Sequence, residues 1–139
     1  MDKSLFEKLM EAGDGNMDIG NIDIDAAVAG YMEAAAWTEE DQLRNDLQDL
    51  GGEFELAPDT QDKMRADVIA FVKEADLLLI RAGIEAGQAG HDFWLTRNGH
   101  GAGFWDRGNG DVGDELTKMC QTFGEYDLYV GDDGLVHGQ

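Results

Sequence analysis

The chain has 139 residues, of which 30 are acidic and 10 basic, so its formal net charge is −20. This length is typical of one domain, and an apolar content of 42% is enough for a packed core. We therefore expect a single domain over residues 1–139. The negative charge repels nucleic-acid phosphates and anionic membrane surfaces, which argues against direct binding to either, and it favours a basic protein surface as a partner.

The cellular compartment follows from three features of the sequence. Cys120 is the only cysteine, so no disulfide can form within the chain. No apolar run is long enough for a membrane span, and the start at Met1–Ser4 lacks the basic and apolar stretches of a signal peptide. We expect a cytoplasmic protein, and no motif in the sequence predicts a cofactor.

Three helices are predicted in the first part of the chain. A serine and a glutamate at capping-box spacing predict a short helix over residues 4–12, which glycines then end. Apolar residues at helical spacing predict a second helix over 23–37, with Asp23 or Asp25 as its cap. Leucines support only a short helix over 40–50, before a loop that contains two glycines.

The clearest helical pattern follows the only proline of the chain. Apolar residues keep helical spacing over five turns between Met64 and Ala82, and Asp59 or Thr60 can cap the start of this helix. Gly83 and the glycines after it indicate that the helix ends there.

The pattern changes to β-type after Gly90. Aromatic and β-branched residues over 93–96 and again over 103–106, with a turn-like segment between them, predict a β-hairpin over residues 92–106. A helix over 111–123 follows, and then a C-terminal strand and hairpin over 127–136. This order predicts an α+β fold in which N-terminal helices pack with a small antiparallel sheet.

Two segments of the C-terminal half carry a family resemblance. They are GHDFWLTRNGHGAGFWDR at residues 90–107 and FGEYDLYVGDDG at residues 123–134, with a weaker segment, YMEAAAW, at residues 31–37. The chain resembles, over about residues 28–38 and 60–136, a family of small phage- and prophage-encoded proteins of unassigned function. The resemblance implies a phage setting and the cytoplasm of a host cell, and it carries no catalytic residues over.

The acidic residues are concentrated in the first half of the chain. Residues 1–62 hold 17 acidic and 3 basic side chains, whereas residues 63–139 hold 13 and 7. Duplex DNA carries about one negative charge per 1.7 Å of its axis, so carboxylates fixed on rigid elements can imitate it. A merely solubilising acidic surface explains the same charge. The candidate partner-binding residues are Asp14, Asp18, Asp23, Asp25, Glu33, Glu39, Glu40, Asp41, Asp46 and Asp49.

Residues 14–25 also come close to a calcium-binding loop. Asp14, Asn16, Asp18 and Asp25 stand at ligand positions of the twelve-residue loop. Ile19 stands where that loop needs glycine, and an aspartate replaces the final bidentate glutamate. A polar loop that caps a helix explains these residues equally well.

A possible secondary site lies in the aromatic segment. A histidine beside an aspartate could act as a base, and several histidines could bind zinc, but no metal-ligand spacing is present, and buried Asp–Arg pairs would also explain these residues. The residues of this set are His91, Asp92, Trp94, Arg97, His100, Trp105, Asp106 and Arg107.

The hypothesis that best fits the sequence is an acidic, non-enzymatic protein that binds and inhibits a basic, nucleic-acid-binding host protein. Restriction enzymes, CRISPR effectors and repressors are the natural targets of such a DNA mimic. The alternatives are a phage accessory protein with another binding role and, third, a small metal-binding protein or hydrolase.

Overall fold

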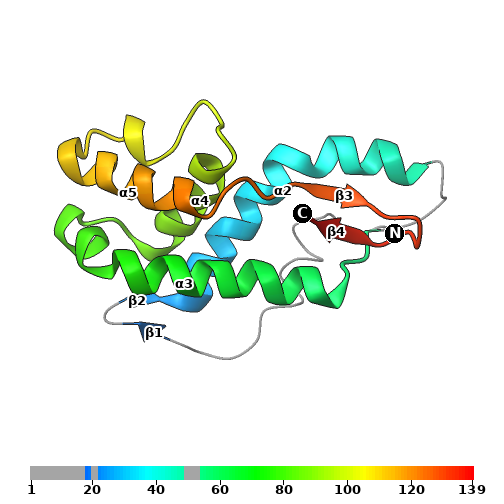
Figure 1. The fold of residues 1–139 in the computed structure, drawn as a ribbon, viewed down its shortest axis with the longest axis horizontal. Coiled ribbons are helices and arrows are strands. Elements are labelled where there is room, and N and C mark those ends of the chain that lie inside the picture. Colours follow the sequence, from blue (N-terminus) through cyan, green and yellow to red (C-terminus); the bar gives the residue numbers. More distant parts are fainter. Residues whose placement is uncertain (1–17, 20–21, 49–53) are drawn as a thin grey trace.

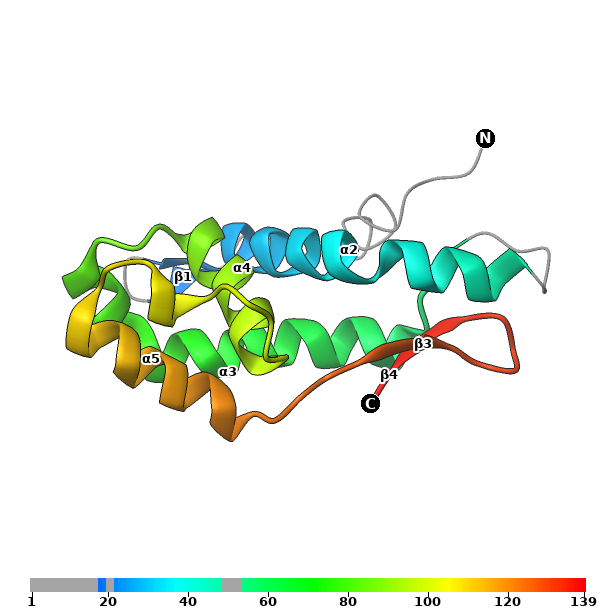
Figure 2. The ribbon, with the colours of Figure 1, turned by 90° about the horizontal axis from the view of Figure 1, so that it is seen from above.

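A computed structural model of the chain describes residues 18–19, 22–48 and 54–139. Two helices of 25 residues each, α2 (Ile24–Gln48) and α3 (Pro58–Ala82), run antiparallel along the length of the molecule (Figures 1 and 2). The shorter helix α4 (Ala86–Arg97) packs against both of them, and α5 (Gly110–Thr122) packs against α3 and α4. The predicted helix over 4–12 lies outside the described residues.

Short strands and a 3₁₀ turn complete the described fold. Strands β1 (Asp18–Ile19) and β2 (Ile22–Asp23) pair antiparallel just before α2, and η1 (Phe104–Asp106) lies between α4 and α5. Strands β3 (Leu128–Val130) and β4 (Val136–Gly138) form the C-terminal hairpin. The predictions of an α+β fold, of a helix over 111–123 and of a hairpin over 127–136 are confirmed.

The C-terminal hairpin is attached to the start of α3 through its strand β4. Val136 pairs with Val130 of β3 and forms a parallel bridge to Leu56. The backbone N–H of Ala57 donates to the carbonyl of Val136 at 3.0 Å, and the N–H of Val136 donates to that of Glu55 at 2.7 Å. These bonds fix the hairpin at the end of the molecule where α3 begins (Figure 1).

Helix α2 is longer than predicted, because it joins the expected helices over 23–37 and 40–50. The carboxylate of Asp23 accepts a hydrogen bond from the N–H of Ala26 at 3.2 Å, so Asp23 is the cap at its start. No glycine or proline interrupts residues 38–40, and Thr38 bonds to the carbonyl of Ala34 instead of breaking the helix.

The predicted hairpin over 92–106 is wrong, because residues 92–97 belong to α4 and residues 104–106 form η1. Every residue from Asp92 to Arg97 is buried, since α4 lies in the middle of the helices. A helix that is buried on all sides shows no amphipathic period, and a short apolar run of this kind cannot be told from a buried strand by periodicity.

Two glycines allow α2 and α4 to touch through their backbones. A Cβ atom on Gly90 would lie 1.7 Å from the carbonyl oxygen of Ala27, and one on Gly30 would lie 1.9 Å from that of Gly87. Gly87 and Gly90, expected to loosen the end of the preceding helix, are therefore part of α4, and at Gly90 only glycine fits this helix crossing.

Helix α3 begins at Pro58 rather than after a capping side chain. Pro58 has the fixed φ angle that suits a first helical turn. The prediction that Asp59 or Thr60 caps the helix is wrong, because no side chain caps its start. Gly83 ends the helix in the left-handed conformation, with φ of 69°.

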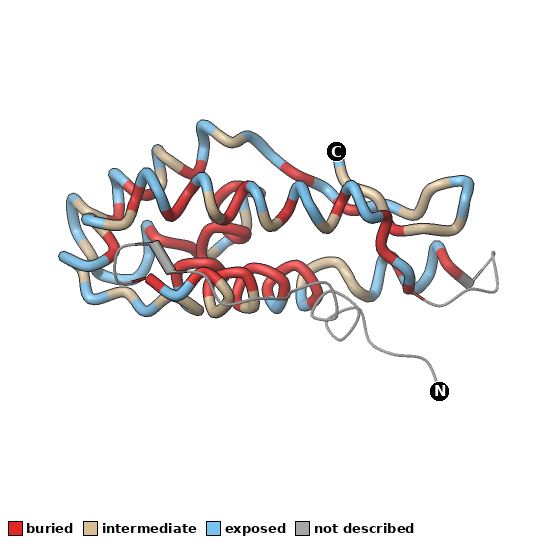
Figure 3. Tube along the Cα trace, turned by 90° about the horizontal axis from the view of Figure 1, so that it is seen from below, coloured by how far each residue is buried: buried red, intermediate tan, exposed pale blue. Residues whose placement is uncertain are grey.

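The core is formed where the helices face each other, and buried residues line their facing sides (Figure 3). Its centre is aromatic. The rings of Phe71 and Phe93 stack at 4.4 Å, and Tyr31 contacts Phe93 and Trp94, each at 5.3 Å between ring centroids. The described helices include none with the length and apolar character that crossing a membrane requires.

Candidate functional site

Carboxylates gather at the end of the molecule that carries the C-terminal hairpin. Three segments meet there: the last turns of α2 from Glu39 onward, residues 55–63 around the start of α3, and residues 125–139 with β3 and β4 (Figure 1). We call these described residues the acidic end. Helices α2 and α3 hold six of its acidic side chains, and the other five lie before α3 and in the segments that flank and connect β3 and β4.

The acidic end has a much larger excess of acid than the remainder of the described chain. It contains 11 acidic residues and 2 basic ones, whereas the remaining described residues contain 13 acidic and 6 basic ones. The acidic residues are Glu39, Glu40, Asp41, Asp46, Glu55, Asp59, Asp62, Glu125, Asp127, Asp132 and Asp133, and the basic ones are Arg44 and Lys63.

Both cations of the acidic end already have partners. The Nζ atom of Lys63 binds Asp67 of the core at 2.9 Å. The guanidinium of Arg44 lies 3.8 Å from Glu40 and covers the ring of Phe54 at 4.7 Å. Within the described ranges, Arg44 is therefore the one lysine or arginine that pairs with a carboxylate of the acidic end, and most of the negative charge faces solvent without compensation.

Two carboxylates of the acidic end have shifted pKa values. Burial raises the pKa of Glu39, the nearby Asp127 carboxylate raises it further, and His100 opposes the shift. The backbone N–H of Leu135 lowers the pKa of Asp133, and His137, whose Nε2 lies 2.9 Å from the carboxylate, lowers it further. The pKa effect of Asp127 on Glu39 indicates that α2 and the hairpin bring their negative charges close together.

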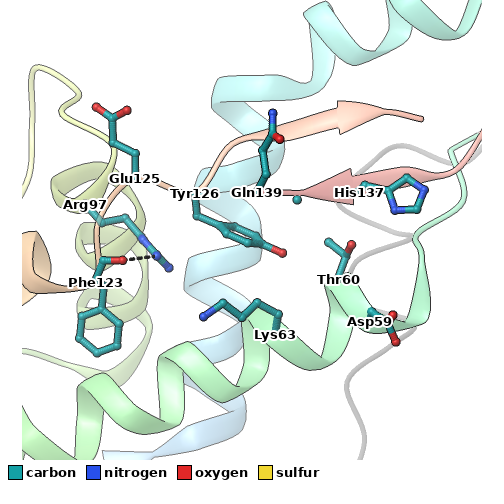
Figure 4. A pocket seen from close by; sticks show the side chains of 10 residues that line it. Asp59, Thr60, Lys63, Arg97, Phe123, Glu125, Tyr126, His137 and Gln139 are labelled. Atoms are coloured by element: carbon teal, nitrogen blue, oxygen red, sulfur yellow. Dashed lines mark hydrogen bonds between the residues drawn. The ribbon is translucent and has the colours of Figure 1, made fainter. Parts of the chain in front are cut away.

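A cleft of about 520 Å³ opens on the acidic end between α3, the α5–β3 connection and β4 (Figure 4). Arg97 and Lys63 reach toward each other at one side of it, since both bind Asp67, and the ring of Tyr126 lies beside them (Figure 4). Burial raises the pKa of the Tyr126 phenol. Asp59, Thr60, Phe123, Glu125, His137, Gly138 and Gln139 complete the lining.

Arg97 is a structural centre rather than a free cation of this cleft. Its guanidinium donates to Asp67 at 2.8 Å and to the hydroxyl of Tyr31 at 3.1 Å. It also donates to the backbone carbonyls of Phe123 and Gly124. A single buried side chain thus joins α2, α3, α4 and the connection to β3. Asp67 engages both Arg97 and Lys63, and Asp59 and Glu125 add two carboxylates to the lining, so the cleft offers little uncompensated positive charge to an anion.

The chemistry available in the cleft is limited. His137 is oriented by Asp133, as the base of a catalytic pair would be, but no hydrogen bond joins it to a described serine, threonine or cysteine. No group of three or more His, Cys, Asp or Glu side chains suited to a metal ion occurs among the described residues.

The predicted partner-binding residues lie in three different places. Glu39, Glu40, Asp41 and Asp46 belong to the acidic end. Asp23 caps α2, Asp25 pairs with Arg65 at 3.0 Å, and Glu33 is exposed halfway along α2. Asp18 lies in β1, while Asp14 and Asp49 lie outside the described residues, as does most of the first half of the calcium-like loop.

The predicted secondary site is divided between two polar networks and the core. Asp92 is buried and accepts from Arg107 at 2.9 Å and from Gln88 at 2.9 Å. Arg97 belongs to the separate network with Asp67. Trp94 is buried in the core, Trp105 is exposed, and Asp106 accepts a hydrogen bond from the N–H of Gly103. His91 lies beside Asp92, with 3.8 Å between its Nδ1 and the carboxylate, and His100 lies near Glu39.

Sequence reasoning did not include the acids of the hairpin in the site. Asp127, Asp132 and Asp133 lie 80 or more residues after those of α2 and belong to the less acidic half of the sequence. The predicted strand over 127–130 was the available signal, but only the bridge between Leu56 and Val136 places this strand beside the start of α3.

Comparison of the chain with known protein families, with curated proteins and with solved structures finds no match.

Proposed function

We propose that the protein binds a basic, nucleic-acid-binding protein through the acidic end and thereby keeps nucleic acid from binding to that partner. The observation that carries this proposal is the excess of 11 carboxylates over two cations that already have partners. Such a surface attracts basic proteins over long range and accelerates the encounter with them.

The arrangement of the charges supports competition with nucleic acid. A surface that grips DNA uses lysine and arginine side chains that displace counterions from phosphates. Carboxylates on α2, on α3 and beside the β3–β4 hairpin can occupy the same cations with little loss of conformational entropy, because the helices and the hydrogen-bonded hairpin already hold the backbone that carries them. We propose that the partner loses access to nucleic acid while it is bound.

The resemblance of residues 90–107 and 123–134 to phage proteins supports a target in host defence or transcription. Restriction enzymes and CRISPR effectors are such targets, because they carry large basic surfaces for nucleic acid. On this proposal the protein acts by binding, without catalysis. A phage accessory protein that binds without mimicry is the alternative, and a metal-binding protein or hydrolase is the third.

The test compares two variants that each remove four negative charges. The first is Asp41→Asn, Asp46→Asn, Asp127→Asn, Asp132→Asn in the acidic end. The control is Glu74→Gln, Asp111→Asn, Asp114→Asn, Glu115→Gln on α3 and α5, and all eight side chains are exposed. The immobilised chain captures a partner from bacterial lysate. After purification, its affinity is measured at two salt concentrations, with and without duplex DNA.

We expect the acidic-end variant to weaken binding by about ten-fold or more, and the control by much less. The affinity of the partner for the unaltered chain should fall as the salt concentration rises, and duplex DNA should displace the chain from the partner. Equal losses in both variants, or a complex that DNA does not displace, would contradict the proposal. Thermal melting of both variants verifies that they remain folded.

A further inference from the structure

Trp37 is the most conspicuous side chain on the outer face of α2. It is 73% exposed, more than any other large apolar side chain of the described residues. Exposed tryptophans are uncommon in soluble domains and are enriched at the centres of protein interfaces. Trp37 also takes no part in the core, which buries Trp94 instead.

The indole of Trp37 is held in place from the neighbouring helix. The ring of His91 in α4 lies 6.2 Å from it, with 26° between the two planes. The Nδ1 atom of His91 lies 3.8 Å from the carboxylate of the buried Asp92, which is beyond hydrogen-bond distance. Because the two rings stack, one face of the indole is turned toward α4, and this contact reduces the cost of ordering the side chain on binding.

A carboxylate lies one turn before Trp37 on the same helix face. Glu33 is exposed and forms no ion pair with any described lysine or arginine. Residues four apart on a helix are neighbours on its surface, so the carboxylate and the indole face the same space.

A shallow hollow between α2 and α4 adjoins Glu33, and it includes His91, on which the indole stacks. Its volume is about 330 Å³, and Glu33 and His91 form part of its wall. Its floor consists of small residues, Ala26, Ala29, Gly30 and Gly87, because the two helices touch there through backbone atoms. A partner side chain that enters this hollow contacts Glu33, and the exposed indole of Trp37 lies one helical turn further along α2.

We propose that Trp37 and Glu33 bind an arginine side chain of the partner protein. The inference rests on the proposed function and names the contact that gives it selectivity. A guanidinium stacks on an aromatic face and pairs with a carboxylate through two parallel hydrogen bonds. An ammonium group has no plane to stack and is more strongly hydrated, so arginine is preferred over lysine. An apolar occupant would leave the Glu33 carboxylate buried and unpaired.

The first test uses short peptides and the indole N–H resonances of the protein. Ac-Gly-Arg-Gly-NH₂ is titrated in, and Trp37→Phe assigns the Trp37 signal. The lysine peptide tests the preference for a guanidinium, and the citrulline peptide, which has the same shape without charge, tests the need for a cation. Trp105→Phe is the matched control, because Trp105 is the other exposed tryptophan, at 53%.

We expect the arginine peptide to shift the Trp37 signal in the unaltered chain and in Trp105→Phe. Glu33→Gln and the lysine peptide should each weaken binding by about three-fold or more, and the citrulline peptide should cause no shift. An equal response to citrulline or lysine, an unchanged affinity in Glu33→Gln, or the absence of a Trp37 shift would overturn the proposal.

The second test separates this inference from the proposed function. Partner affinity is measured for Trp37→Ala and Trp105→Ala beside the acidic-end variant. If Trp37→Ala lowers the partner affinity by about ten-fold or more and Trp105→Ala does not, the result supports the arginine site. If the acidic-end variant weakens binding while Trp37→Ala leaves it unchanged, the inference is wrong and the proposed function stands. If the acidic-end variant has no effect but the Trp37 signal responds to the arginine peptide, the proposed function is wrong and the arginine site stands.

Discussion

The two ends of the molecule use charge in opposite ways. In the rest of the described chain, which we call the helical end, three acids are joined to cations of other segments: Asp25 to Arg65, Asp67 to Arg97 and Asp92 to Arg107. The described residues of the acidic end include 11 carboxylates and two cations, and of these two cations only Arg44 pairs with a carboxylate of that end. Charge therefore holds segments together at one end and accumulates on the surface at the other.

This difference separates charges that serve the fold from charges available to a partner. A buried pair whose cation is removed leaves an uncompensated charge, which strongly destabilises the protein. Uncompensated charge on the surface costs stability by mutual repulsion, and a basic partner relieves that repulsion. We therefore expect substitutions of these paired residues to destabilise the protein, and neutralising substitutions in the acidic end to preserve or increase its stability.

The largest expected effect is that of Arg97→Met. The substitution leaves the Asp67 carboxylate and the Tyr31 hydroxyl without their buried partner, so the free energy of unfolding should fall by about 3–5 kcal/mol. Chemical denaturation measures this loss. Arg81→Met, at an exposed position, is the control and should lose less than about 1 kcal/mol. If Arg97→Met with Asp67→Leu is no more stable than Arg97→Met alone, the unpaired carboxylate is not the cause.

The next effect compares two glycines of α4. Gly90→Ala places a methyl group on the carbonyl of Ala27, so the helices must separate and the free energy of unfolding should fall by about 3 kcal/mol. At Gly87 a Cβ atom would lie 3.8 Å from the nearest atom, so Gly87→Ala should gain up to about 1 kcal/mol from its helical preference. Similar melting temperatures for the two variants would show that the helices do not touch at Gly90.

The smallest effect is a gain, from Glu39→Gln in the acidic end. Because the pKa of Glu39 is raised, the folded state holds this proton more tightly than the unfolded state. The stability that protonated Glu39 contributes is complete below the usual glutamate pKa of about 4.3, and it is lost as the pH rises through the raised pKa of the folded state. Glutamine stays neutral at every pH and avoids this loss, so Glu39→Gln should be more stable than the unaltered chain at pH 7. The gain should be less than about 1 kcal/mol, because solvent screens the charge of a half-buried group.

The pH dependence of melting measures this gain. At pH 3 the glutamate is protonated in both states, so Glu39→Gln and the unaltered chain should melt at similar temperatures. Asp41→Asn removes a charge from an exposed position on the same helix and should gain less at pH 7. A gain from Glu39→Gln that is equally large at pH 3 would mean that the charge of Glu39 is not responsible.

Much of the fold follows from local pattern. The five-turn apolar repeat of α3, the apolar face of α5 and the strand over 127–130 are present in the sequence, and all three form as predicted. Asp23 caps α2, as one of the two expected residues. Spacing and capping depend on neighbours in the chain, which is why these elements can be found without coordinates.

The acidic end could be predicted only in part. Four of its acids, Glu39, Glu40, Asp41 and Asp46, stand out because they lie close together in an acidic stretch. Asp25 belongs to the same stretch, yet Arg65, 40 residues away, neutralises it. Pairing across the fold decides which acids remain free, and neither spacing nor composition contains that information.

The sequence by itself determined the charge, helix α3 and the C-terminal hairpin, because these depend on composition and on residues a few positions apart. The tertiary structure decided that residues 92–97 are helical, because burial on every side overrides the β-preference of Phe93, Trp94 and Thr96. It also decided which carboxylates meet at one end, because contacts between distant segments, such as that of Leu56 with Val136, bring together charges that lie far apart in the chain.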